Sequence, residues 1–172
     1  MSKESYRQLL GHICSQANLT DTESVYASGN IVVNDIPFTL IHDENGDDDG
    51  LRMYCDFGKP APERRALALQ RLLETNLYMF SAAGAPSFGF NQENGRVVMM
   101  ARMALSQVSA ASLLRAMGEF SSYAAQWREK YFLLDTEHEA GNSAVHANAR
   151  NAGAALIRRA LSAAATDAPA GG

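Results

Sequence analysis

The sequence predicts an α+β fold with an antiparallel sheet and helices packed on it. Apolar residues repeat at helical spacing in three segments of the first 134 residues. Five shorter segments rich in β-branched and aromatic residues lie between them, bounded by turn-forming residues. Their order is helix, three strands, helix, two strands, helix, with no internal repeat, so helices segregated on one antiparallel sheet are expected.

The first helix is expected over residues 3–17. Its apolar residues fall at i, i+3, i+4, i+7, i+8 and i+11, which places them on one helical face: Tyr6, Leu9, Leu10, Ile13, Cys14 and Ala17. Ser2 can cap this helix. A polar connection then leads to the strands.

Three strands are expected at residues 31–33, 36–41 and 51–57. Asn34-Asp35 suits a tight turn between the first two, because both residue types tolerate turn conformations. The third strand alternates, with one face formed by Leu51, Met53, Cys55 and Phe57.

Pro60 and Pro62 should open a second helix, since proline suits a first helical turn. Its leucines cover much of its circumference and predict burial on two sides: Leu67, Leu69, Leu72, Leu73 and Leu77. Gly84 ends it. Residues 87–91 and 96–103 then form a hairpin, with Asn94-Gly95 at its turn.

The last helix of this unit is expected to start at Ser106 or Ser109. Spacings of four and three define its core stripe: Leu113, Met117, Phe120, Ala124, Trp127, Tyr131 and Leu134. Residues 1–134 therefore form one domain. Residues 135–172 are an Ala-rich extension, for which we expect one helix over about residues 143–165 and a frayed tail.

Composition excludes several classes of protein. Fifteen Lys and Arg against nineteen Asp and Glu give a net charge of -4 without clustered cations, which disfavours nucleic acid as the partner. No apolar run approaches the ~18 residues of a membrane span, and the N-terminus lacks signal-peptide features. Cys14 and Cys55 are interpreted as reduced core thiols. A cytoplasmic protein is expected.

No catalytic, metal or cofactor motif is found. The acidic loop at residues 43–50 resembles a calcium loop at alternate positions, but Asp48 replaces the required glycine and Tyr54 the bidentate carboxylate. A solvated loop is therefore favoured over a weak cation site. No two of the four histidines have the spacing of a helical zinc pair: His12, His42, His138 and His146. We expect neither enzymatic activity nor a cofactor.

Some strands are apolar on both faces. Phe38 and Leu40 have Thr39 and Ile41 opposite them, and a continuous apolar run follows the hairpin turn: Val97, Val98, Met99, Met100 and Ala101. Two apolar faces indicate either helices on both sides or a docking surface for another chain. Methionine-rich surfaces suit varied apolar partners, while core filling remains the alternative interpretation.

Residues 3–132 resemble the class I type III secretion chaperones, the Tir chaperone (CesT-type) family. The likeness rests on the order of elements and on three local stretches: Leu72-Leu73-Glu74-Thr75-Asn76-Leu77, Phe88-Gly89-Phe90-Asn91 before Val97-Val98-Met99, and Ala124 to Trp127-Arg128. It implies a homodimer that binds an extended N-terminal segment of a secreted effector, keeps it soluble and helps present it to the secretion ATPase. It implies no catalysis.

The resemblance also assigns surfaces. It places the dimer interface at the second helix and following strand: Leu69, Leu72, Leu73, Asn76, Phe88 and Phe90. It places the effector groove on the first helix and the sheet: Leu9, Ile13, Ile31, Val33, Phe38, Leu40 and Met53. Phe38 could instead be a core residue. The alternative function is a stand-alone α+β regulatory module that binds a folded protein or a small ligand.

Overall fold

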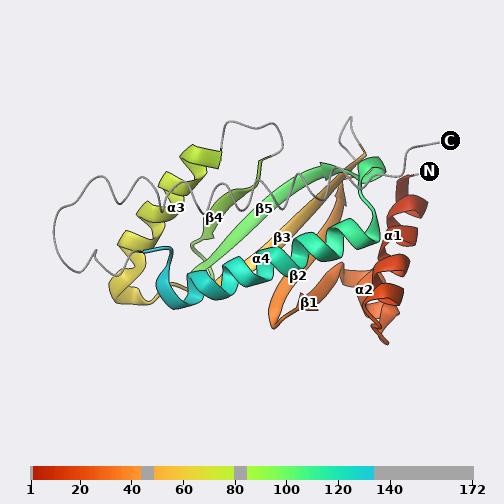
Figure 1. Cartoon of the computed structure of the whole chain (residues 1–172), viewed down its shortest axis with the longest axis horizontal. Coiled ribbons are helices and arrows are strands. Elements are labelled where there is room, and N and C mark those ends of the chain that lie inside the picture. Colours follow the sequence, from red (N-terminus) through yellow and green to blue (C-terminus); the bar gives the residue numbers. More distant parts are fainter. Residues whose placement is uncertain (1, 44–48, 80–84, 134–172) are drawn as a thin grey trace.

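The computed structural model describes residues 2–43, 49–79 and 85–133 (Figure 1). The expected order of helices and strands is confirmed, with one additional short helix. The expected C-terminal helix and tail, and residues 44–48 of the acidic loop, lie outside the described residues.

Five antiparallel strands form one sheet in the order β1-β2-β3-β5-β4. The strands are β1 (Asn30–Val33), β2 (Ile36–Asp43), β3 (Gly50–Gly58), β4 (Ser87–Asn91) and β5 (Arg96–Ala104). Asn34 and Asp35 form the expected tight turn, both with positive φ. The sheet therefore consists of a β1–β2–β3 meander joined to the β4–β5 hairpin through β5.

Helix α1 (Ser2–Gln16) packs against the last helix and the short second one. The Tyr6 hydroxyl donates a hydrogen bond to the Leu40 carbonyl oxygen at 2.8 Å, which ties α1 to β2. Helix α2 (Thr22–Ser28) occupies what the sequence predicted as a polar connection. Asp21 caps its N-terminus and Gly29, at φ 67°, ends it.

Helix α3 (Arg65–Met79) follows a short 3-10 turn, Pro62–Arg64, so the expected proline start is confirmed. Helix α4 (Ala110–Lys130) begins after Ser109, whose side chain forms a capping box with Ser112. Ser106 instead lies in the 3-10 turn Leu105–Gln107. Of the two expected caps, Ser109 is the one used.

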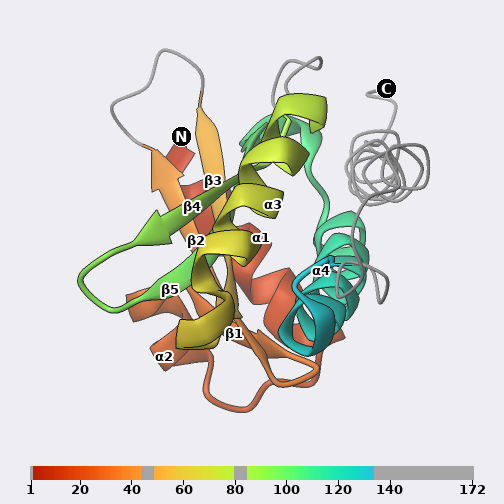
Figure 2. The same ribbon diagram turned by 90° about the vertical axis from the view of Figure 1, so that its left-hand side faces the viewer.

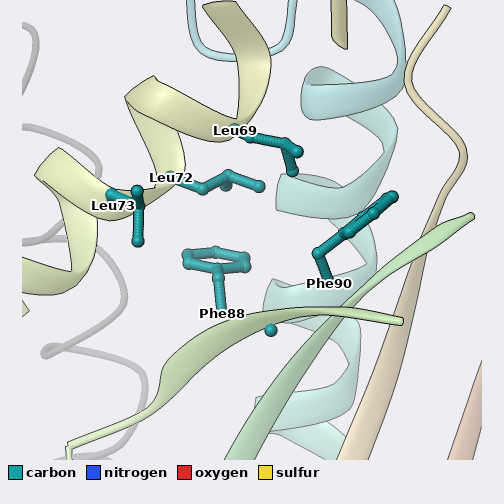
Figure 3. A pocket seen from close by; sticks show the side chains of 6 residues that line it. Leu69, Leu72, Leu73, Phe88 and Phe90 are labelled. Carbon is teal, nitrogen blue, oxygen red and sulfur yellow. The ribbon is translucent and has the colours of Figure 1, made fainter. Parts of the chain in front are cut away.

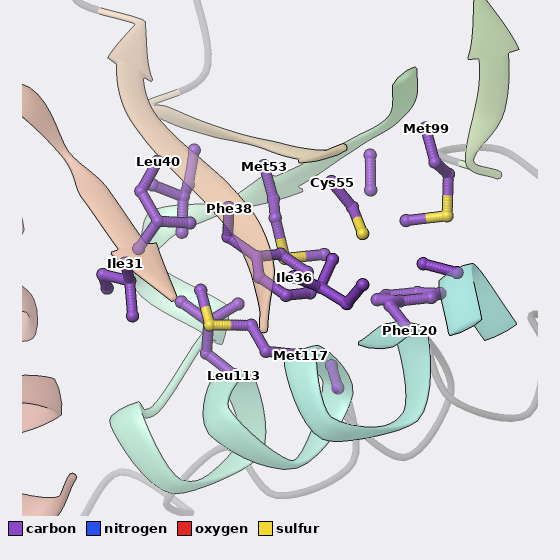
Figure 4. Packing of buried hydrophobic residues seen from close by; sticks show 14 of the residues in the cluster. Ile31, Ile36, Phe38, Leu40, Met53, Cys55, Met99, Leu113, Met117 and Phe120 are labelled. Atoms are coloured by element: carbon purple, nitrogen blue, oxygen red, sulfur yellow. The ribbon is translucent and has the colours of Figure 1, made fainter. Parts of the chain in front are cut away.

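The core lies between the sheet and α4, which crosses β3, β2 and β1 (Figures 1 and 4). The side chains that meet there are buried and come from alternate strand positions and one face of α4: Ile36, Phe38, Leu40, Met53, Cys55, Met99, Leu113, Met117 and Phe120. Asn34 fastens the β1–β2 turn to α4 by donating to the Ser121 hydroxyl oxygen at 2.8 Å.

Aromatic rings close the other end of the core, at the C-terminal end of α4. Trp127 packs edge-on against Phe57 with ring centroids 6.0 Å apart, and Phe132 contacts Phe88 at 6.2 Å. The Tyr131 hydroxyl accepts a hydrogen bond from the Ala61 backbone N–H at 3.0 Å. This cluster positions α3 beside edge strand β4 (Figure 2).

Among the described residues, the helices are too short or too polar to cross a membrane.

Candidate functional site

The two faces of the sheet have different environments. On the face toward α4, strand residues at alternate positions are almost fully buried. On the opposite face, helices in the described part of the chain leave large apolar side chains exposed, including Val32 at 63%, Ile41 at 43% and Met100 at 37%. We call this second face, from Val32 on β1 to Met100 on β5, the open face.

Most of the residues expected to line an effector groove do not lie on the open face. Six of the seven are buried within the chain itself: Leu9, Ile13, Ile31, Phe38, Leu40 and Met53. Val33 is half-buried and packs against the same core. These side chains belong to the core of the chain in this structure, and Figure 4 shows Ile31, Phe38, Leu40 and Met53 packed against residues of α4.

Alternation along the strands separates the buried residues from the exposed ones. Successive side chains of a strand point to opposite faces, so Ile41 faces away from Leu40, and Met100 away from Met99. The sequence contained the signal, since the third strand alternates with Arg52 and Tyr54 opposite its apolar set. The helix-covered face is the uniformly apolar one, and the mixed face is open.

Charged side chains lie among the apolar residues of the open face. Arg52 on β3 forms an ion pair with Asp43 at the end of β2. Arg96 on β5 pairs with Asp56 on β3, its Nε donating to the Asp56 Oδ2 at 2.7 Å. The face is therefore amphipathic, which suits a partner that carries both apolar and charged side chains.

A small pocket lies between α3 and edge strand β4 (Figure 3). Its volume is about 160 Å³, and its lining is Leu69, Leu72, Leu73, Phe88, Gly89 and Phe90. Five of the six residues expected at a dimer interface thus come together around one cavity. Leu72 and Phe88 are buried, Leu69 and Phe90 are half-buried, and Leu73 is exposed.

The sixth residue, Asn76, fixes the position of β4. Its side-chain amide donates to the Phe88 carbonyl oxygen at 3.0 Å and accepts from the Phe88 backbone N–H at 2.7 Å. These polar groups lie on the free edge of β4, because among the described residues β5 is the one strand that pairs with β4. Asn76 therefore replaces a neighbouring strand at this point and holds α3 against the edge.

The outer surface of α3 is strongly apolar beside this pocket. Leu73 is 69% exposed and Leu77, one turn later, is 74% exposed. Leu67, on another side of the helix, is 42% exposed and does not line the pocket. Helix α3 has more apolar surface than its contacts within the domain cover, so the surface of another molecule can cover these leucines.

The described residues contain no group of three or more His, Cys, Asp or Glu side chains that could hold a metal ion. Both cysteines are buried and unbridged. Burial raises the pKa of the Cys55 thiol well above its usual value, and the neighbouring Asp56 charge adds to the rise. Cys55 is therefore a protonated core thiol rather than a nucleophile.

Comparison with known proteins gives a family match. Residues 11–128 match the model of the Tir chaperone protein (CesT) family. No curated protein matches the sequence significantly.

Two solved structures share the fold. A chain of the HopA1-SchA chaperone-effector complex aligns with a TM-score of 0.54 at 18% identity, covering 75% of this chain and 97% of that one. A chain of the ExsC-ExsE complex aligns with a TM-score of 0.50 at 15% identity, covering 74% and 93%.

Proposed function

Because the chain belongs to the Tir chaperone protein (CesT) family, we propose that it is a cytoplasmic chaperone of a bacterial type III secretion system. In this proposal it binds an extended N-terminal segment of an effector, keeps that segment soluble and secretion-competent, and helps present it to the secretion ATPase. It performs no catalysis. The open face of the sheet is the observation that supports effector binding most directly.

An unfolded segment needs a large apolar surface, since ordering it costs conformational entropy. The open face offers apolar side chains on β1, β2 and β5 that the helices described by the structure leave exposed. The fold is also shared with a chain from a chaperone-effector complex. We therefore assign effector docking to the open face around Val32, Ile41 and Met100, instead of the buried set.

We propose that the functional unit is a homodimer formed through α3 and β4. Exposed Leu73 and Leu77 lie next to the pocket whose rim includes Phe88 and Phe90, so a second copy can bury all of these apolar groups. A small-ligand module is less well supported, because the pocket is smaller than the roughly 300–1,000 Å³ typical of ligand sites.

The test of effector binding is co-expression with N-terminal segments of proteins encoded by neighbouring genes, followed by titration calorimetry of any stable complex. The double variant Ile41→Ser with Met100→Ser should lose about thirtyfold or more in affinity, as hot-spot truncations do. The control Leu67→Asp, on α3, should bind normally. Normal binding by the double variant would remove the open face from the proposal.

The test of the dimer is sedimentation equilibrium. Leu73→Asp should give monomers or aggregates, because it places an unpaired charge in an apolar interface. Leu67→Asp is the matched control on the same helix and should remain dimeric. A wild-type protein that is monomeric at micromolar concentration would contradict the proposed dimer. Effector binding at the open face would still be decided by the calorimetric test.

A further inference from the structure

Two arginines lie directly opposite each other at the centre of the open face. In the antiparallel register of β3 and β5, Arg52 pairs with Arg102. Both are exposed, and both point away from α4, because their strand neighbours Met53 and Ala101 are buried. Like charges at directly opposed positions of an antiparallel pair destabilise the sheet.

The two arginines differ in their ion pairing within the described residues. Arg52 forms the ion pair with Asp43, while Arg102 has no carboxylate partner among the described residues. A strand position on an open face accepts many uncharged residues that would avoid the repulsion. The described residues therefore give Arg102 no carboxylate that would offset its charge.

Apolar side chains surround the arginine pair. Ile41 on β2 is the cross-strand neighbour of Arg52, and Met100 lies two residues before Arg102 on the same face of β5. Adjacent strands are about 4.8 Å apart and same-face residues about 7 Å apart, so a bound segment can contact an apolar group and a guanidinium together. The chain as a whole is acidic, with a net charge of -4, which makes this cationic site a local exception.

We propose that Arg102, together with Arg52, selects effector segments in which an Asp or Glu lies among apolar residues. This inference rests on the proposed function and specifies the chemistry of its partner. A carboxylate placed between the two guanidinium groups relieves their repulsion and accepts charge-assisted hydrogen bonds from them. In this proposal a carboxylate of the partner offsets the charge of Arg102, as Asp43 offsets the charge of Arg52.

The first test is the stability of the free protein. Arg102→Gln removes the repulsion and should raise the melting temperature by roughly 1–4 °C relative to Arg102→Lys, which keeps the charge. The two variants have similar side-chain length, so the comparison isolates the charge. A variant Arg102→Gln that melts at or below Arg102→Lys would overturn the proposal, because the charge would then be compensated within the chain.

The second test uses random peptides displayed on phage and selected on the purified protein. The wild type should enrich peptides with an acidic residue flanked by apolar ones, whereas Arg102→Glu should enrich basic residues at that place. Lys59→Glu makes the same charge reversal at an exposed position outside the sheet and should select like the wild type. A selected acidic peptide should bind Arg102→Gln roughly tenfold more weakly than the wild type.

The outcomes distinguish the role of the arginine pair from the proposed chaperone function. If the wild type and Arg102→Glu enrich apolar peptides of the same charge, the role of the arginine pair is overturned. The proposed chaperone function is not affected by that result. A wild type that enriches no peptide would count against both the arginine pair and the proposed binding of unfolded segments.

Discussion

The two faces of the sheet are built from the same five strands and differ in what covers them. The face toward α4 is continuous core, with Phe38, Met53 and Met99 each at most 1% exposed. The open face alternates exposed apolar residues such as Ile41 with charged ones such as Arg52. Folding requires the first pattern, because apolar burial against α4 stabilises the domain.

The second pattern is not required for folding. Polar residues are sufficient on a sheet face that is open to water. Apolar side chains on that face are exposed to water and do not stabilise the isolated chain. Residues that maintain the fold and residues available to a partner therefore lie on opposite faces. Adjacent residues of one strand can have these different roles, and single substitutions test each assignment.

The largest expected effect on stability comes from a substitution on the sheet face that α4 covers. Phe38→Ala should lower the free energy of unfolding by about 3–5 kcal/mol, because it leaves a cavity between the sheet and α4. Ile41→Ala, three residues later on the open face, should stay within about 0.5 kcal/mol of the wild type. Chemical denaturation measures both values, and equal losses for the two variants would show that the faces are not distinct.

A smaller effect concerns the Cys55 thiol on the covered face. Burial raises its pKa in the folded state, so the unfolded chain releases this proton at lower pH than the native one. The free energy of unfolding should therefore be unaffected below the usual thiol pKa near 8.5 and should fall as pH rises above it, by about 1.4 kcal/mol per pH unit.

Cys55→Ala should remove this component of the pH dependence, while Met100→Cys, on the open face, should add none. Denaturant titrations between about pH 8 and 10 give the slopes, taken as differences between variants so that other titrating groups cancel. Identical slopes for the wild type and Cys55→Ala would mean that the thiol is hydrated in the native state.

The smallest expected effect on stability concerns Met99 and Met100, which are adjacent in sequence and lie on opposite faces of the sheet. Peroxide should oxidise Met100 well before Met99, since Met99 is fully buried and Met100 is 37% exposed. Oxidation of Met100 alone should leave the melting temperature nearly unchanged. Fragment-ion mass spectrometry distinguishes the two sites, and equal oxidation rates would contradict the assignment of faces.

Much of the local structure could be predicted from the sequence. The Ser109 cap, the proline start before α3 and the Asn34-Asp35 turn follow from preferences of individual residues, and the structure contains all three. Helix α2 was missed because it is short and has a single buried residue, Val25, so it lacks the apolar periodicity that identifies longer helices.

The candidate sites were predictable to different degrees. Leu73 and Phe88 were expected on one surface, and the pocket between α3 and β4 brings them together. Most residues predicted to line the effector groove are buried instead, because hydrophobicity is shared by core and binding residues. Phe38 and Ile41 are equally apolar, and only the position of α4 makes the first a core residue.

The sequence by itself determined the order and type of the longer elements, because helical and strand periodicities and capping residues act over a few neighbouring positions. The tertiary structure decided which sheet face α4 covers, that Arg52 and Arg102 lie opposite each other, and that Asn76 holds the free edge of β4. These features depend on strand register and helix placement between residues far apart in the chain, and no local pattern specifies them.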